Sequence, residues 1–240
     1  MSSTRRRVET TVVLPLAEEG WEPRHVEMAL LSALRQIRKG FRLSVVDATG
    51  SAAIEALVRR MVPAEILEFE RLIGTGGFLA CLYQGVAGAK SRWVAYLEPG
   101  VVWRNDHLHR LLTTAERCRV DVVFSGNHVC FPDWSDIAPT VRRTNVVPLE
   151  AVVHSLPVYD RLPHGWRRES TWSDWDLWMQ FAVTGAKFAH DPQITAERRI
   201  PRSGLLCALA PPTIALADPY TVEEQAKLTR YDRFVDSMRS

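Results

Sequence analysis

Two acidic side chains stand where this sequence could do chemistry, each at the end of a hydrophobic stretch. Asp47 ends the stretch "FRLSVVD", and Glu98 ends the stretch "WVAYLE". Both stretches are typical of buried strands in a parallel sheet, and ligands bind outside the carboxyl ends of such strands. Pro99 and Gly100 force a turn directly after Glu98. The pattern predicts that both carboxylates lie at one edge of a sheet, where they could bind a ligand or a hard cation through oxygen.

A third acid, Asp174, begins the stretch "SDWDLWMQFAVTG" (173–185). This stretch is typical of a helix, with acids in its first turn and a glycine after its end. A carboxylate at that position could act as a general base at the rim of a pocket. Capping alone is the other explanation, because Ser173 and Asp174 also make a good helix N-terminus. In the same way, Asp47 could simply cap the helix that follows it.

The elements that must position these acids alternate between strand and helix through the first half of the chain. Apolar β-branched runs predict strands, and apolar residues spaced three and four apart predict helices. The expected strands are 10–16, 41–49, 64–70, the stretch that ends at Glu98, and 120–131, and the expected helices are 25–37, 51–61, 78–90 and 105–117. This alternation is typical of an α/β fold with a mostly parallel, Rossmann-type central sheet and helices on both faces.

The second half of the chain is less regular, with several prolines in residues 132–172. We expect a strand-like patch at 144–154, the helix at 173–185, a short strand at 187–192 and an amphipathic final helix at 221–238. The final helix could pack on its own domain or on a second copy of the chain, so a homo-oligomer stays open.

Composition gives no reason to expect nucleic acid as a partner. The 240 residues are 46% hydrophobic and 24% charged, which is ordinary for a globular chain, and the net charge is +2. Basic residues gather at 5–7 and again at Arg198, Arg199 and Arg202. Such clusters are solvated faces, phosphate contacts or contacts with an anionic membrane surface, and all three readings stay open.

The four cysteines are widely spaced and form no CxxC pair, so neither a zinc site nor a redox motif is expected. Cys81, Cys118 and Cys207 lie in apolar surroundings and are expected to be buried free thiols, which fits a reducing compartment. The sequence has no signal-peptide pattern and no apolar run of about 20 residues. We therefore expect a cytoplasmic protein, at most peripheral at the inner face of a membrane.

The order of these pieces resembles that of the inverting family 2 glycosyltransferases with the GT-A fold, over roughly residues 8 to 195. The matching stretches, in order, are "LPLAEE", "HVEMALLSALRQ", "VVDATGS", "GGFLACLYQGV", "YLEPGVVW", "SDWDLW" and "GAKFAHDP". The resemblance implies a single GT-A-like domain over 1–240. It would consist of a nucleotide-sugar-binding half (8–118), an acceptor-side half (119–220) and a C-terminal helix (221–240).

The resemblance also implies roles for individual residues. Asp174 corresponds to the family's catalytic Asp and would be the general base for the acceptor hydroxyl. The donor nucleotide would be bound by Pro15, Ala17, Glu18, Asp47, Gly77, Tyr96 and Glu98. For Gly77 and the glycines just before it, a plain turn ahead of a helix is an equal explanation.

The sequence departs from the family pattern at several functional positions. Gly100 stands where the second Asp of an Asp-x-Asp motif is expected, and Ser173 stands where a Glu usually precedes the catalytic Asp. Glu98 is then the one carboxylate that the motif offers to Mg²⁺ or Mn²⁺, which can also use phosphate oxygens and water. The diphosphate could instead be neutralised by Arg104 or by the late cluster of Arg198, Arg199 and Arg202.

We expect a glycosyltransferase that takes a sugar from a nucleotide-activated donor and passes it, with inversion, to a glycan, lipid-linked or small-molecule acceptor. The alternative is a non-catalytic GT-A-fold protein that serves as a binding or partner subunit of another glycosyltransferase. A nucleotidyltransferase would need a glycine-rich basic loop after the first strand, where "PLAEEGWEPR" is acidic. Trp103 and Trp172 are candidates for acceptor-side walls, and Trp178 is expected in the core.

Overall fold

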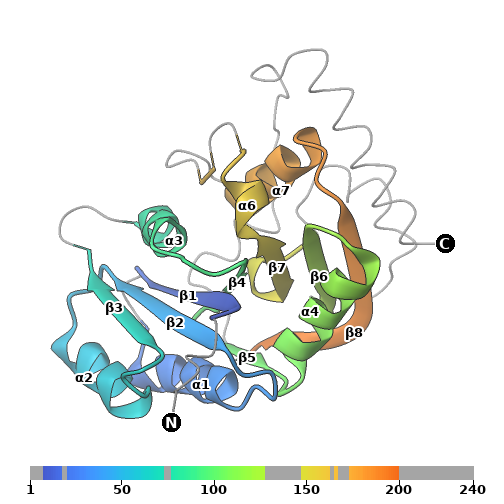
Figure 1. Cartoon of the computed structure of the whole chain (residues 1–240). Helices are drawn as coiled ribbons and strands as arrows, with labels where there is room; N and C mark the ends of the chain where they lie inside the picture. The colour runs from blue at the N-terminus through green and yellow to red at the C-terminus, as the bar shows by residue number, and fades with distance from the viewer. Residues whose placement is uncertain are drawn as a thin grey trace, which may run out of the picture.

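The computed structural model describes residues 8–17, 21–72, 77–127, 147–162, 165–166 and 173–199. In these residues, eight strands form one sheet in the order β3-β2-β1-β4-β7-β6-β8-β5 (Figure 1). The expected final helix at 221–238, the residues Glu18, Trp172 and Cys207, and all of 128–146 lie outside the described part.

The first four strands are parallel and come from the predicted hydrophobic runs. They are β1 (Thr10–Leu16), β2 (Phe41–Asp47), β3 (Leu67–Arg71) and β4 (Trp93–Tyr96). β1 lies between β2 and β4, and it is buried along its whole length because helices cover both of its faces. The prediction of a parallel α/β sheet is confirmed in this region, with strand ends that differ by a few residues.

The remaining strands mix directions. β7 (Val152–Ser155) is antiparallel to both β4 and β6 (Val122–Asn127), and the edge strand β5 (Val101–Trp103) is antiparallel to β8 (Phe188–Arg198). The predicted strand patch at 144–154 is only partly right, because Pro148 precedes a short 3₁₀ helix, η1 (Leu149–Ala151), and the strand begins after it.

β8 is much longer than the predicted strand at 187–192. It continues past Pro192 because its parallel pairing with β6 shifts register there. Ser125 pairs with Asp191, while the next residue, Gly126, pairs with Ile194, so Pro192 is skipped in the ladder. This irregularity carries the strand on to Arg198.

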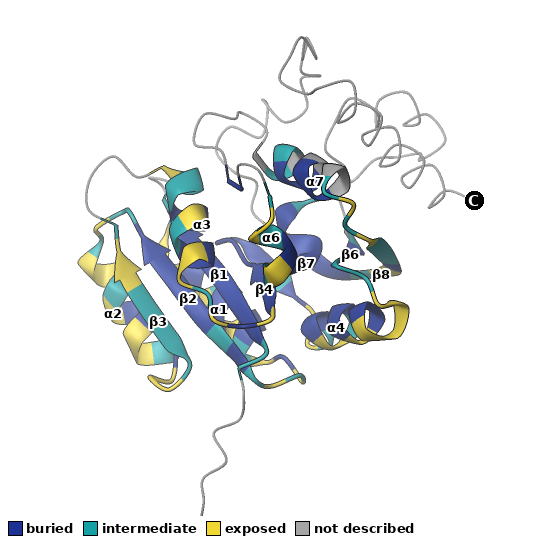
Figure 2. Cartoon of the chain, turned by 45° about the horizontal axis from the view of Figure 1, so that its top comes forward, coloured by how far each residue is buried: buried dark blue, intermediate teal, exposed yellow. Residues whose placement is uncertain are grey.

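Helices cover both faces of the sheet, as predicted (Figures 1 and 2). One face packs against α1 (Pro23–Leu34), α2 (Ala52–Met61) and α4 (His107–Cys118). The other face packs against α3 (Phe78–Ala87), α6 (Leu156–Tyr159) and α7 (Ser173–Val183). Two separate hydrophobic clusters result, one on each side of the sheet.

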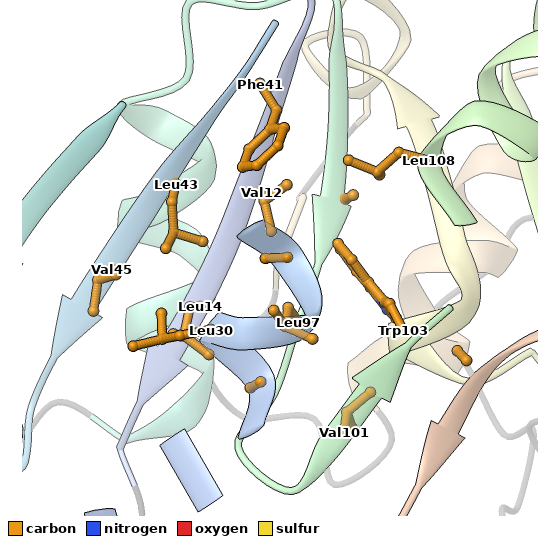
Figure 3. Close-up of a cluster of buried hydrophobic side chains, with 14 of the residues drawn as sticks. Val12, Leu14, Leu30, Phe41, Leu43, Val45, Leu97, Val101, Trp103 and Leu108 are labelled. Atoms are coloured by element: carbon orange, nitrogen blue, oxygen red, sulfur yellow. The ribbon is translucent and has the colours of Figure 1, made fainter. Parts of the chain in front are cut away.

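The cluster on the α1 side contains Trp103 together with Val12, Leu30 and Leu97 (Figure 3). Trp103 is 2% exposed, its indole N–H donates to the Glu150 carbonyl at 2.8 Å, and its ring stacks on His107. Trp103, a candidate for an acceptor-side wall, is thus packed in this cluster, and it also contributes to the lining of two hollows beside β5. Its burial could not be read from the sequence, because β5, which ends at Trp103, is only three residues long.

On the opposite face, α3 approaches β1 closely at Gly85. A Cβ on Gly85 would collide with the Val13 side chain, so only glycine fits there without a shift. Trp178 of α7 lies in the same cluster, 1% exposed, and its indole N–H donates to the Val147 carbonyl at 2.9 Å. The expectation of a core position for Trp178 is confirmed.

Two further expectations concern single residues and the membrane. Cys81 is buried as expected, but Cys118 is exposed, because it lies on the outer side of the last turn of α4. Among the helices of the described part, none is long and apolar enough to cross a bilayer.

Candidate functional site

Asp47 and Glu98 lie at the same edge of the sheet, on either side of β1. Asp47 is the last residue of β2 and pairs in register with Leu16, the last residue of β1. On the other side, Tyr96 pairs with Val13, so Glu98 follows two residues later, near the same level. Two strand spacings separate β2 from β4, or about 10 Å. The predicted convergence of the two strand ends is thus present in the fold.

Asp47 is fully buried, and its two carboxylate oxygens differ. Oδ1 accepts hydrogen bonds from the Thr49 backbone N–H at 2.9 Å and from the Thr49 hydroxyl at 2.6 Å. Oδ2 is buried and has no hydrogen-bond partner among the described residues. Asp47 does not cap α2, because the Ser51 hydroxyl does so by accepting from the Ile54 N–H. Its free acceptor therefore has no structural use in the described part of the chain.

Cys81 of α3 lies close to Asp47, which the sequence did not reveal. Burial, with a further contribution from the Asp47 carboxylate, raises the pKa of the Cys81 thiol to about 11. The thiol is thus neutral at physiological pH. Its closeness to Asp47 shows that α3 covers this strand end from one side.

Glu98 is also buried, at 1% exposure, but it has a cationic partner. Arg198, at the end of β8, places Nη2 at 3.1 Å from a Glu98 oxygen. The same Nη2 lies 3.0 Å from Glu150, whose other oxygen accepts from Arg198 Nε at 3.1 Å. One guanidinium therefore joins two buried carboxylates.

The charge of Arg198 is secured by these neighbours. Burial acts to lower its pKa, but the carboxylates of Glu98 and Glu150 outweigh that and raise it above its ordinary value. The sequence pattern indicates Arg198 only as one of several late arginines, and it gives no sign of Glu150. No local signal pointed to either, because the contact depends on β8 continuing past Pro192.

The described residues do not fit a divalent cation at Glu98. No group of three or more His, Cys, Asp or Glu side chains within the described ranges is arranged to hold a metal ion. The guanidinium of Arg198 lies against the carboxylate that would have to be the first ligand. A divalent cation would have to displace this guanidinium before it could bind Glu98.

The other predicted donor-site residues have varied surroundings. Pro15 is buried within β1, Ala17 follows the end of that strand, and Gly77 is the exposed residue ahead of α3 with an ordinary φ of −74°. Tyr96 is fully buried, and burial raises its pKa well above the usual value. Their roles in binding a nucleotide stay predictions.

The Tyr96 hydroxyl takes part in a buried hydrogen-bond chain. It accepts from the indole N–H of Trp166 at 3.3 Å and lies 2.7 Å from Nε2 of His154. Since the indole can only donate, the hydroxyl proton is available to a neutral His154. Burial lowers the pKa of His154 to about 3, which agrees with this arrangement. Tyr96 thus supports the strand that leads to Glu98.

Asp174 lies in the first turn of α7 and is half-buried. Asp176, two residues later, accepts from the Gln180 side chain at 2.9 Å within the same helix. α7 covers the face of the sheet that α3 also covers. The structure thus brings Asp47 and Glu98 to one edge, and places Asp174 on a helix of the α3 side.

Two hollows lie elsewhere, at the edge strand β5. One, of about 580 Å³, lies between β5 and β8 and is lined by Val102, Arg104 and Ile194. The other, of about 410 Å³, lies between β5 and α1 and is lined by Leu31 and Val102. Neither hollow is lined by Asp47 or Glu98. Arg104 pairs there with Asp106, which precedes α4 without capping it through its side chain.

No protein-family model matches this chain, and no curated protein matches its sequence. Solved structures match it in fold. Mannosyltransferase PcManGT from Pyrobaculum calidifontis, in complex with GDP-Man and Mn²⁺, has a TM-score of 0.69 and 18% identity, over 82% of this chain and 59% of that one. S. aureus TarS 1–349 has a TM-score of 0.60 and 13% identity, over 79% of this chain and 60% of that one.

The same S. aureus protein in complex with UDP-GlcNAc has a TM-score of 0.61 and 13% identity, over 79% of this chain and 58% of that one. The chain therefore spans less than two thirds of the length of these proteins. At such identities the likeness establishes the fold, which is GT-A-like.

Proposed function

We propose that this protein is a glycosyltransferase that moves a sugar from a nucleotide-activated donor to an acceptor hydroxyl with inversion. The observation that supports it best is Asp47: a buried carboxylate oxygen without a partner in the described residues, at the carboxyl edge of a GT-A-like sheet. Ligands of open α/β sheets bind at this edge. A buried acceptor without a partner is costly, so a ligand that donates to it would be bound favourably.

In this proposal Asp47 accepts a hydrogen bond from the base or ribose of the donor nucleotide. Pro15 near the end of β1 and Ala17 after it lie beside Asp47. Glu18, Gly77, Tyr96 and Glu98 are assigned to the donor side as well. Asp174 is the general base. It removes the proton from the acceptor hydroxyl while that oxygen bonds to the anomeric carbon, and the bond to the nucleoside diphosphate breaks on the opposite face. A single displacement of this kind inverts the anomeric centre.

The first experiment is a panel of nucleoside diphosphates and nucleotide sugars, including GDP, UDP, GDP-Man and UDP-GlcNAc, tested for thermal stabilisation. A ligand at a hundred times its dissociation constant adds about 2.7 kcal/mol to the free energy of unfolding, which gives a clear rise in Tm. We expect a rise with the diphosphates of one base. Absence of any rise across the panel contradicts a donor site at Asp47.

Asp174→Asn tests the transfer itself, once a donor is identified. Loss of a general base lowers kcat by about 10²–10⁴-fold. The substitution should leave donor binding unchanged, because Asp174 is assigned to the acceptor. Asp160→Asn, which removes an exposed carboxylate after α6, is the matched control and should retain full activity. Equal activity of the two variants contradicts the role of Asp174.

A non-catalytic protein of the same fold is the second candidate, and the pairing of Glu98 with Arg198 favours it. In that case the protein would serve as a binding or partner subunit of another glycosyltransferase. The two candidates differ in turnover. If the unsubstituted protein binds a nucleotide sugar but neither transfers nor releases its sugar, the result favours the non-catalytic protein.

A further inference from the structure

Arg198 lies beside Glu98, where the sequence pattern predicts Mg²⁺ or Mn²⁺. Its Nη2 contacts Glu98 at 3.1 Å and Glu150 at 3.0 Å. The two carboxylates therefore face each other across one nitrogen, about 6 Å apart at most. They are 1% and 5% exposed. The guanidinium lies between these two buried carboxylates, and a pair of carboxylates so close together attracts a cation.

The second carboxylate that is missing after Glu98 is thus supplied from another part of the chain. Gly100 has no side chain to offer, and Glu150, which precedes β7 in the 3₁₀ helix η1, faces Glu98 instead. A guanidinium separates the two. Arg binds carboxylates in a planar, paired geometry and keeps its charge at every physiological pH, so it suits a permanent cation.

The backbone holds Arg198 in this place. Arg198 pairs in register with Val101 of β5, and the N–H of Arg199 donates to the Gly100 carbonyl at 2.9 Å. The end of β8 is thus fastened to the turn that follows Glu98. A metal ion would have to displace a side chain that is paired with two carboxylates and held by the sheet.

One nitrogen of the guanidinium is buried and has no hydrogen-bond partner in the described part of the chain. Nε and Nη2 of Arg198 are engaged by the two carboxylates, whereas Nη1 has no hydrogen-bond partner among the described residues. An N–H group of this kind, at the strand edge that also carries Asp47, is suited to a phosphate oxygen.

We propose that Arg198 is the resident cation of this site and that the diphosphate of the donor binds without a divalent metal. The first part concerns the chain alone, and the second rests on the proposed function. Glu98 and Glu150 hold the guanidinium, and Arg198 Nη1 donates to the diphosphate.

The first test uses MnCl₂ alone and follows Tm. The unsubstituted protein should melt at the same temperature in millimolar Mn²⁺ and in EDTA. Arg198→Ala should melt lower in EDTA and regain several degrees in Mn²⁺, because the two buried carboxylates, no longer separated by Arg198, can then share a metal ion. The double variant Arg198→Ala/Glu98→Gln should not regain stability in Mn²⁺.

The matched control is Arg110→Ala. Arg110 makes a similar bidentate pair with Asp191, which is 5% exposed, at 2.8 and 3.1 Å. This variant leaves one buried carboxylate instead of two and should gain nothing from Mn²⁺. A gain as large as that of Arg198→Ala would overturn the assignment of a two-carboxylate cation site.

The result that would overturn the proposal is a rise in the Tm of the unsubstituted protein, with Glu98→Gln as its control. A rise of several degrees with Mn²⁺ that disappears in Glu98→Gln would show that a metal ion displaces Arg198, and would overturn the proposal. For the diphosphate, titration calorimetry with GDP and UDP should give dissociation constants within about threefold in EDTA and in Mn²⁺. Binding at least tenfold weaker in EDTA would overturn metal-free binding of the donor.

These outcomes separate the two proposals. If neither nucleotide binds under any condition, the proposed function and metal-free donor binding fail together, while the Mn²⁺ experiment still decides whether Arg198 is the cation of the site.

Discussion

The ends of β2 and β4 carry one buried carboxylate each, and the protein treats them differently. Asp47 has one oxygen satisfied by Thr49, two residues away, and a second oxygen without a partner in the described residues. Glu98 is neutralised by Arg198, from the far end of the described chain. One strand end therefore keeps a buried acceptor without a partner in the described residues, and the other already has its cation.

The difference shows that two acids in equivalent positions of a sheet need not have equivalent roles. A carboxylate whose partners are local can keep an oxygen available, since a short turn reaches only one side of it. A carboxylate that is met by a distant strand can be enclosed completely. The position of Glu98 predicts that it binds a cation, and in the structure that cation is the guanidinium of Arg198.

Substitution of Arg198 should lower the free energy of unfolding more than any of the changes that follow. Arg198→Met removes the guanidinium that lies between the buried Glu98 and Glu150, and loss of one member of a buried ion network costs about 3–5 kcal/mol. Urea unfolding would measure this loss. The triple variant Arg198→Met/Glu98→Gln/Glu150→Gln removes the charges together and should recover most of it. Equal stability of the single variant and the original protein would contradict a structural role for the network.

Asp47→Asn should weaken nucleotide binding more than it lowers the free energy of unfolding. The amide oxygen can still accept from Thr49, whereas the second oxygen becomes an NH₂ group that cannot accept from a ligand. A hydrogen bond to a charged group contributes about 1.5–3 kcal/mol, so GDP or UDP should bind about 10–100-fold more weakly. Calorimetry would measure the affinity, with Asp160→Asn as the charge-matched control. An unchanged affinity would place the nucleotide elsewhere.

Low pH should lower the free energy of unfolding by a smaller amount, through two buried histidines on the Glu98 side of the sheet. His154 pairs in register with Val94 of β4, and His107 stacks on Trp103, so both lie on the Glu98 side. Burial lowers the pKa of each to about 3, against about 6.5 in an unfolded chain. The unfolded state therefore binds more protons between these values, and stability falls as the pH drops below about 6.5.

Each of these histidines contributes a slope of about 1.4 kcal/mol per pH unit to the free energy of unfolding. In His154→Gln the slope between about pH 6 and about pH 5 should be shallower by that amount. Urea unfolding at several pH values measures it. A slope identical to that of the original protein would mean that His154 is protonated in the folded state.

The sequence predicted what depends on neighbours along the chain. The runs that became β1, β2 and β4 were recognisable because both faces of a parallel strand are buried and the residues are apolar throughout. Ser51 was recognisable as a cap because capping is local. The position of Asp47 and Glu98 at one edge followed from the same parallel arrangement.

The sequence could not predict what depends on long-range pairing. The contact of Arg198 with Glu98 and Glu150 requires an irregular pairing of β8 with β6 around Pro192, which local patterns argue against. Trp103 looked available for a sugar because nothing nearby in sequence indicates that η1 accepts its indole N–H. The short strand β5 was missed because three residues give no usable period.

β7 has a consequence for how this chain could be divided. It is the strand that lies between β4 and β6, and it comes later in the sequence than either. A fragment that ends before residue 147 would therefore leave β4 with one open edge and β6 without either of its neighbours, because β8 is missing as well. Open edges pair readily with other chains, so such a fragment should aggregate when produced alone. Supplying the missing strands from a second fragment is the condition for recovering it in folded form.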